Sequence, residues 1–235
     1  MSYTVKGRKS SDPHKHKTMN IKHLSGRTIL QTAALASVLT ACISCNRHME
    51  HFSDSEKALI NGADSIMRVL TTENADDLAV LRSKSTDLSA ASLVSEDYAR
   101  LAELMTATVT HPSQDGVGIA APQVGLNRRI VAVQRFDKVG EPFEVYANVR
   151  IVWASDTLAL GSEGCLSVPE MRGEVLRSTS IIIEYADLNT LKANGSTDEI
   201  PVVRDTINGF TAVIFQHEID HLEGILYTDR LQTDI

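Results

Sequence analysis

The segment INGFTAVIFQHEIDHLEG, residues 207–224, most strongly constrains how this chain can fold. Its pattern predicts a helix, with Asn208 as a candidate N-cap and Gly224 as a candidate glycine just past the C-terminal end. One stripe of this helix is apolar for two turns and then carries two histidines: Phe210, Val213, Ile214, His217 and His221. The fold must therefore be built around a helix that directs two imidazoles inward.

The two histidines have the spacing His217-Glu218-x-x-His221. On a helix, positions i and i+4 lie about 40° apart in rotation and roughly 6 Å apart along the axis, so both imidazoles can reach one metal ion. Glu218, rotated by about 100°, can then lie beside a water on that ion. The same short pattern also occurs where the histidines are ordinary core or surface residues. By itself it predicts a metal site without establishing one.

A catalytic metal site requires three protein ligands and an open position. No histidine or cysteine follows His221, so the third ligand must come from upstream, and Cys165 in EGCLSVPEMR (163–172) is the best candidate. A Cys/His/His set suits Zn²⁺ or Fe²⁺. The alternatives are that Cys165 is a nucleophile or an inert core residue. The nucleophile interpretation is weaker, because the best base, Glu218, is already placed for water activation.

A glycine-rich segment, DGVGIAAPQVG (115–125), precedes these motifs. Gly116 and Gly118 allow close backbone approach to a ligand, and Gln123 offers an amide donor. The segment is not a phosphate-binding loop, because no Lys-Ser/Thr pair follows the glycines. In isolation it could equally be an ordinary turn leading into a strand.

The rest of the body predicts one α+β domain. Residues 95–109 have helical spacing behind Ser95, a candidate N-cap. Three β-branched stretches, 129–136, 143–153 and 178–188, predict short strands in an antiparallel arrangement, and the absence of βαβ alternation argues against a doubly wound fold. At 235 residues and 43% hydrophobic content, the chain can form one substantial core.

The N-terminal region differs in charge from the rest. Residues 1–41 contain seven Lys/Arg and one acidic residue, and residues 28–41 carry no charge. The tetrapeptide LTAC, ending at Cys42, resembles a bacterial lipoprotein cleavage box. We therefore predict a signal peptide over 1–42 with a lipidated Cys42 as a membrane tether, a polar tether over 43–64, and a catalytic domain over 65–235.

This prediction places the protein in the bacterial cell envelope, anchored by lipid. Alternatively, residues 28–41 form a buried helix of the main domain, and the protein is cytoplasmic because the leader is not used. The chain beyond residue 41 has 16 basic and 29 acidic residues, a formal charge of −13. A surface of this sign repels phosphate backbones, so nucleic acid is excluded as a partner.

Taken together and in order, GVGIAAPQVG, EGCLSVPEMR and QHEIDHLEG resemble the three signature motifs of peptide deformylases. The resemblance covers about residues 65–235. It implies an α+β fold, with short antiparallel sheets around a central metal-binding helix. It also implies a metal-dependent hydrolase that removes the formyl group from N-formylmethionyl peptides and releases formate.

The resemblance also implies a role for each motif residue. Cys165, His217 and His221 would bind one divalent metal ion, commonly Fe²⁺, with Zn²⁺ or Ni²⁺ able to substitute. Glu218 would handle protons. Gln123 and the backbone N–H of Leu166 would donate hydrogen bonds to the developing oxyanion, a type of contact worth about 3 kcal/mol. An exported iron–thiolate site is prone to oxidation, so we predict Zn²⁺ or another redox-inert ion here.

For the peptide, the resemblance maps Gly118 to backbone pairing with an extended chain and Arg172 to the rim beyond the methionine. Phe210, Val213 and Ile214 would line the methionine pocket, or would simply pack in the core.

Two acidic residues, Glu163 and Asp220, either orient the metal ligands or form structural ion pairs. The alternative functions are a catalytically weak, deformylase-derived peptide-binding lipoprotein and a small metalloprotease. The intact Glu218 and Gln123 argue against a binder, and the upstream cysteine ligand argues against a protease.

Overall fold

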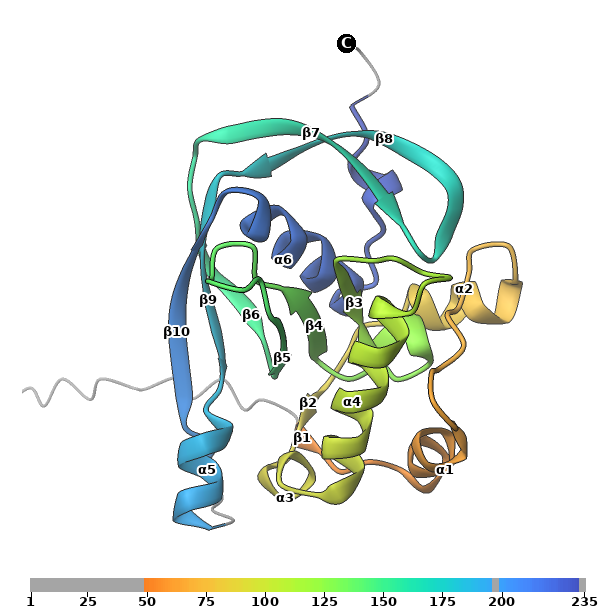
Figure 1. Ribbon diagram of the computed structural model, residues 1–235, viewed down its shortest axis with the longest axis vertical. Coiled ribbons are helices and arrows are strands. Elements are labelled where there is room, and N and C mark those ends of the chain that lie inside the picture. Colours follow the sequence, from red (N-terminus) through yellow and green to blue (C-terminus); the bar gives the residue numbers. More distant parts are fainter. Residues whose placement is uncertain (1–48, 196–198, 233–235) are drawn as a thin grey trace, which may run out of the picture. The chain divides into compact units, whose positions relative to one another are not determined.

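The computed structural model describes residues 49–195 and 199–232 (Figure 1). The predicted signal peptide and the first residues of the predicted tether lie outside these ranges. The described helices and 3-10 turns are α1 (Asp54–Gly62), α2 (Ala75–Leu81), α3 (Ala90–Leu93), α4 (Glu96–Thr110), η1 (Ala121–Val124), α5 (Leu188–Asn194), α6 (Gly209–Leu222) and η2 (Tyr227–Arg230). The strands are β1 (Met49–Glu50), β2 (Asp87–Leu88), β3 (Gly118–Ala120), β4 (Ile130–Gln134), β5 (Phe143–Ala147), β6 (Arg150–Ala154), β7 (Leu158–Cys165), β8 (Val168–Ser178), β9 (Ser180–Ala186) and β10 (Val202–Asn208).

The predicted helix over 207–224 is α6. Asn208 precedes it in extended conformation, but its side chain makes no capping hydrogen bond, and Gly224 follows it with φ +71°, a value that favours glycine. A Cβ at Gly224 would also lie 2.3 Å from the carbonyl oxygen of Arg82, so the chain can turn here only without a side chain. In Figure 1, α6 lies centrally, between the β7–β8 hairpin and strands β3 and β4. Within the described ranges, no helix is long and apolar enough to cross a membrane.

The strands form short antiparallel sheets, as predicted. Two sheets have three strands each, in the orders β10-β9-β6 and β3-β4-β5, and β7 pairs with β8 as a long hairpin. The exception is the parallel pair of β1 with β2. Asn148, at φ +52°, divides the predicted strand 143–153 into β5 and β6. The fold class is therefore α+β, with α6 between the sheets.

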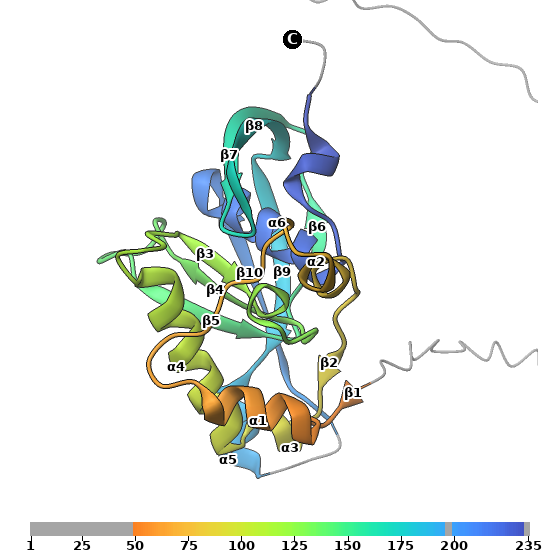
Figure 2. The same ribbon diagram turned by 90° about the vertical axis from the view of Figure 1, so that its right-hand side faces the viewer.

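Helix α4 supplies much of the first core. The side chain of Ser95 accepts a hydrogen bond from the backbone N–H of Tyr98 at 3.2 Å, so the predicted N-cap is confirmed. Leu101, Leu104 and Met105 are buried on one face, at the predicted helical spacing. A second cluster packs α6 against β4 and β9 through residues such as Phe215 and Ile183. Figure 2 shows α1, α3 and α5 gathered at the end of the fold opposite the β7–β8 hairpin.

The N-terminal segment 49–64 differs from the predicted tether. Phe52 and Ile60 are buried in the first core cluster, and α1 begins with a complete capping box of Ser53 and Glu56. The buried guanidinium of Arg128 forms hydrogen bonds with Glu56 at 2.7 Å and with Glu50 at 2.6 Å. The folded domain therefore includes this segment. The prediction of a tether was wrong because the segment is held by only two buried apolar residues, Phe52 and Ile60, which are too far apart to give a strong helical pattern.

Candidate active site

Two elements bring the three predicted ligands together. His217 and His221 project from the same side of α6, with ring centroids 5.1 Å apart. Cys165 ends β7, and its Sγ lies 3.2 Å from His221 Nε2. One ligand atom from each of the three residues lies within 4.8 Å of the other two. The predicted ligand set is thus assembled across 56 residues of sequence separation.

This donor set fits a single divalent metal ion. A thiolate and two imidazoles match the preferences of Zn²⁺ and Fe²⁺, and three protein ligands leave one position open, as in catalytic sites. Cys165 and His217 also line a cleft, so an open position on the ion would be accessible to a substrate. Among the described residues, Cys165, His217 and His221 form the one group of three or more Cys, His or acidic side chains that is close enough together to hold a metal ion.

Glu218 lies beside the ligands and faces the cleft. Its side chain is buried, with a residue exposure of 4%, and Oε2 has no hydrogen-bond partner in the described part of the protein. Burial raises the pKa of Glu218 to about 7. A carboxyl group whose pKa lies near neutral pH, and which has no structural hydrogen-bond partner, is suited to accepting and returning a proton.

Gln123 lies beside Cys165 and is held in place by two hydrogen bonds. Its Oε1 accepts a hydrogen bond from the backbone N–H of Ala120 at 2.8 Å, and its Nε2 donates to Ser167 Oγ at 3.2 Å. The same Nε2 lies 3.6 Å from Cys165 Sγ. The amide nitrogen therefore points toward the metal-ligand cluster, as its predicted role requires.

Glu163 orients His217. Its Oε2 lies 2.8 Å from His217 Nδ1, leaving Nε2 of that ring for a metal. The guanidinium of Arg177 donates to both carboxylate oxygens of Glu163, at 2.7 and 3.0 Å. Burial raises the pKa of Glu163, but the hydrogen bonds from His217 and Arg177 outweigh it and lower the pKa to about 2. Glu163 is therefore an ionised positioning residue.

Asp220 has the structural role. It accepts hydrogen bonds from Arg177 at 2.6 Å and from Arg230 at 2.6 and 2.7 Å. The sequence left open whether these acids orient the metal ligands or form structural ion pairs, and each acid has one of these two roles. Glu163 contacts a ligand, whereas Asp220 forms ion pairs that hold Arg177 against Glu163.

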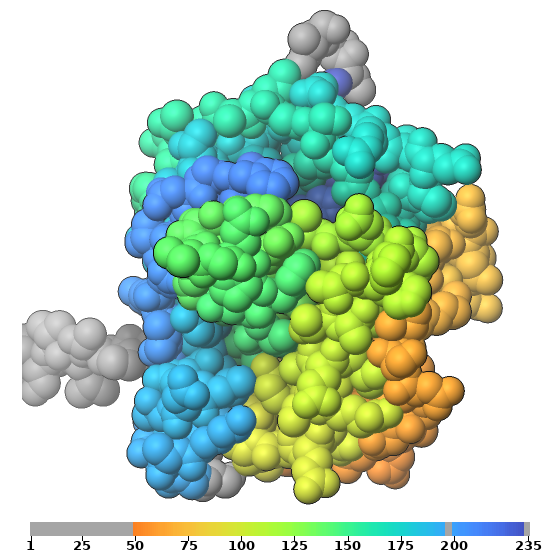
Figure 3. All heavy atoms as spheres, viewed as in Figure 1, coloured from red at the N-terminus to blue at the C-terminus, as the bar shows by residue number. Residues whose placement is uncertain are grey.

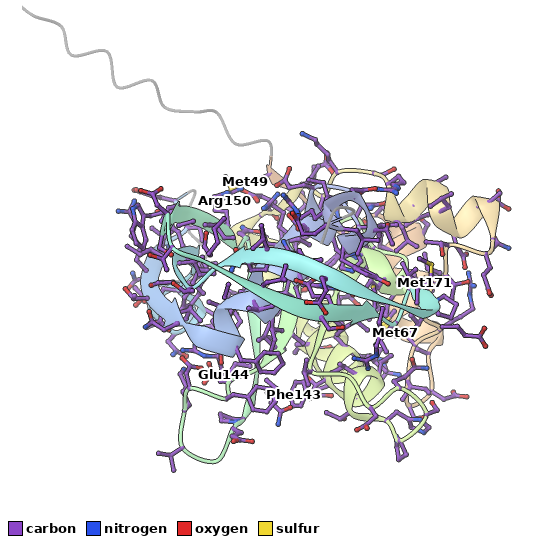
Figure 4. All side chains as sticks on the ribbon, turned by 90° about the horizontal axis from the view of Figure 1, so that it is seen from above. Met49, Met67, Phe143, Glu144, Arg150 and Met171 are labelled. Carbon is purple, nitrogen blue, oxygen red and sulfur yellow. The ribbon has the colours of Figure 1, made fainter. Side chains whose placement is uncertain are left out.

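A cleft of about 670 Å³ opens above Glu218 and the ligands. All five residues predicted to bind the peptide line it: Gly118, Arg172, Phe210, Val213 and Ile214. In Figure 3, the surface is recessed where α6 passes between the β7–β8 hairpin and the segment before β3. Met171, exposed at the far end of the hairpin, also lines the cleft (Figure 4).

The apolar residues of the α6 stripe are not equivalent. Ile214 is buried and packs in the second core cluster, so it serves both the core and the cleft wall. Phe210 is 57% exposed and contacts Phe136, with ring centroids 5.3 Å apart. Packing in the core therefore does not explain Phe210, and it is available to a ligand.

Two residues of the site were not predicted from sequence. Ser167 directly follows Leu166 within a motif already identified, so its proximity was a usable signal. Arg177 gave no local signal, because its partners Glu163 and Asp220 lie 14 and 43 residues away.

Fold and site together define a metal-dependent hydrolase of the α+β class, with a helical His-Glu-x-x-His motif and an upstream cysteine ligand. A family model described as polypeptide deformylase matches residues 66–234. The chain belongs to the peptide deformylase family, whose members are metal-dependent enzymes that remove formyl groups.

Named relatives agree with this assignment. A peptide deformylase of Leptospira biflexa is 37% identical over 161 residues, covering 66% of this chain and 83% of that protein. A peptide deformylase of Caulobacter sp. strain K31 is 35% identical over 168 residues, covering 71% and 88%.

Solved structures are similar as well. The class I type b peptide deformylase of Acinetobacter baumannii, crystallised with Met-Ala-Ser, has a TM-score of 0.59 and 33% identity, covering 71% of this chain and 98% of that one. The peptide deformylase of Thermotoga maritima also has a TM-score of 0.59, with 30% identity, covering 72% and 99%.

Proposed function

We propose that this protein removes the formyl group from N-formylmethionyl peptides, with one divalent metal ion held by Cys165, His217 and His221. The observation that carries the proposal is the meeting of these three ligand atoms within 4.8 Å of one another. They lie beside the buried, unpartnered carboxyl group of Glu218 and at the edge of a peptide-sized cleft.

The side chains of the site divide the chemistry. When bound, the ion supplies positive charge that polarises a carbonyl and lowers the pKa of a water toward about 7. Glu218 accepts the proton of the attacking water and returns it to the leaving amine. The amide of Gln123 and the backbone N–H of Leu166 donate to the oxygen on which negative charge develops, each contact being worth about 3 kcal/mol. Glu163 keeps His217 in one orientation throughout.

The cleft supports an extended peptide. Gly118 lies in β3, an outer strand of its sheet, and β3 pairs with β4 on its other side. The open edge of β3 can therefore accept a peptide backbone, as in β-strand addition. The apolar wall of Phe210, Val213 and Ile214 suits a methionine side chain, and Arg172 lies at the exposed rim. The Acinetobacter baumannii deformylase, which was crystallised with Met-Ala-Ser, supports a peptide as the ligand of this cleft.

Only the sequence supports a proposal for the location. Cys42 and the apolar segment before it support a lipid-anchored protein of the bacterial cell envelope. In that compartment we expect Zn²⁺ or another redox-inert ion, because an iron-bound thiolate is prone to oxidation. Stoichiometric iron in native protein purified anaerobically would contradict this expectation.

The test is formate release from formyl-Met-Ala-Ser by the metal-loaded chain under anaerobic conditions, beside Glu218→Gln as the matched control. We expect release by the wild type and a loss of at least about 100-fold in the variant, because general acid–base catalysis contributes about 10²–10⁴-fold. Equal metal content in both proteins shows that the site is intact. If the folded, metal-replete wild type binds the peptide without releasing formate, the protein is a peptide-binding lipoprotein instead.

A further inference from the structure

An exposed apolar stripe runs along the outer face of the fold, away from the catalytic cleft. Trp153, Leu158 and Leu160 are 50%, 53% and 45% exposed, and Leu176 is also exposed. The strand register places these residues on one continuous ribbon, since Leu160 lies opposite Leu176 and Trp153 opposite the half-buried Ile182. We call Trp153, Leu158, Leu160, Leu176 and Ile182 the outer stripe.

The outer stripe is separate from the active site. None of its residues lines the cleft. On β9, Ile182 alternates with Ile181 and Ile183, which are buried on the opposite face in the core around α6. In Figure 1, α6 packs against the inner side of β6 and β9, and no described helix covers their outer side. The stripe therefore needs an explanation beyond catalysis and core packing.

A row of charged residues borders the stripe. Glu184 lies between Arg150 on β6 and Arg204 on β10, so two arginines flank one carboxylate across the sheet. Arg204 donates to Glu184 at 3.0 Å, yet its side chain remains 67% exposed. An aromatic and aliphatic surface bordered by an exposed arginine, Arg204, is suited to a lipid headgroup region, where tryptophan is enriched and long basic side chains reach the phosphates.

The described chain also begins beside this border. Met49 pairs with Asp87, and Asp87 accepts a hydrogen bond from Arg150 at 2.8 Å. Figure 4 shows Met49 and Arg150 close together. Cys42 precedes Met49 by only seven residues, which can span at most about 25 Å at roughly 3.6 Å per residue. A lipid on Cys42 would hold this edge of the domain near a bilayer.

From these observations, we propose that the outer stripe rests on the surface of the lipid bilayer and orients the enzyme there. The proposal rests on the proposed lipid anchor of Cys42 for its geometry, and is independent of the deformylase chemistry. The metal-ligand cluster of Cys165, His217 and His221 lies toward the inner face of the β7–β8 hairpin, where Glu163 and Arg177 are buried. A domain lying on its outer stripe would thus keep its cleft open to peptides.

The sole tryptophan of the sequence is Trp153, so intrinsic fluorescence reports directly on the stripe. The experiment uses an unlipidated chain that begins at residue 43 and contains every described element, titrated with phosphatidylcholine vesicles with and without brominated acyl chains. We expect a blue shift of the emission and quenching by the brominated lipid. The double variant Leu158→Ser/Leu160→Ser should lower the partition coefficient roughly tenfold or more, because membrane binding scales with buried apolar area.

The matched control is Val139→Ser, which removes an exposed apolar side chain from the β4–β5 loop, outside the stripe. It should bind vesicles as the wild type does. Formate release should be unchanged in both variants, which confirms folding and separates this test from the proposed function. No quenching by brominated lipid would overturn the proposal. So would a blue shift that depends on protein concentration without vesicles, because the stripe would then bind a second copy of the chain.

Discussion

Replacing Gly118 with alanine tests whether the position of Glu218 depends on the close approach of β3. A Cβ at this position would lie 2.5 Å from Glu218 Oε1 and 2.8 Å from Ile214 Cγ2. Both of these side chains are buried at 4% exposure, so a Cβ would push each from its present position, the carboxylate toward the cleft that it lines. Overpacking of this kind costs about 1–3 kcal/mol, which is roughly 2–12 °C in Tm for a chain of this size.

The activity should fall further than the stability loss explains, because the displaced carboxylate is the proposed proton carrier. We expect Gly118→Ala to lower kcat/KM for formyl-Met-Ala-Ser by at least about 100-fold, within the range for general acid–base catalysis. Formate release and thermal unfolding are measured on the same metal-loaded samples at a temperature where both proteins are folded.

The matched control is Gly116→Ala. Its Cβ would lie 2.8 Å from Val109 Cγ2 and 3.2 Å from Leu166 Cδ1, so it overpacks a neighbouring site without contacting the carboxylate. We expect a similar decrease in Tm with a much smaller decrease in kcat/KM. If Gly118→Ala retains the kcat/KM of this control, the close approach of β3 does not position Glu218, and the reasoning fails.

Three further predictions concern the residues around the site and the N-terminal segment. Glu163→Gln should weaken metal affinity roughly tenfold, measured by competition with a chelator, because the ionised carboxylate no longer orients His217; unchanged affinity would contradict that role. Arg177→Met should lower the free energy of unfolding by about 3–5 kcal/mol in urea, since Glu163 and Asp220 lose a shared buried partner; a loss below about 1 kcal/mol would show that the network is not needed. Burial raises the pKa of Glu56, but hydrogen bonds from Arg128 and Ser53 outweigh this effect and lower the pKa. Glu56 therefore stabilises the fold at pH values above its ordinary pKa of about 4.3, and this contribution is lost as the pH falls through the pKa of the folded state. Glu56→Gln should therefore be less stable than the wild type at pH 7, with a difference that narrows below about pH 4 in urea midpoints; a constant difference down to pH 3 would argue against this linkage.

Local patterns predicted helices α4 and α6 and strands β4, β5, β6 and β9, but not the β7–β8 hairpin or β10. The stripe on 207–224 predicted α6, since a helix that buries one face needs apolar residues at that spacing whatever surrounds it. The same spacing placed His217 and His221 together, because both lie on one helix and their separation is fixed by its geometry. Cys165 followed from the need for a third ligand and the lack of a downstream candidate.

The segment 49–64 shows where pattern reasoning failed. Its capping box, Ser53 to Glu56, was legible in the sequence, but Phe52 and Ile60 were too few to indicate a buried helix. Their burial depends on α4 and on Arg128, which are distant in sequence. A short helix of this kind is stabilised by tertiary packing more than by its own propensity.

Residue types and short-range spacing were thus enough to identify the family from its three motifs and to predict the central helix with its two histidines, because each of these features lies within one segment of the chain. The acid that orients a ligand could be assigned only from the packed structure, since Glu163 and Asp220 share Arg177 but only Glu163 reaches His217. The packed structure also shows that Gly118 must lack a side chain, because the atoms that exclude a Cβ come from α6, about a hundred residues along the chain. Contacts between distant elements are set by how the layers pack, and no local pattern records them.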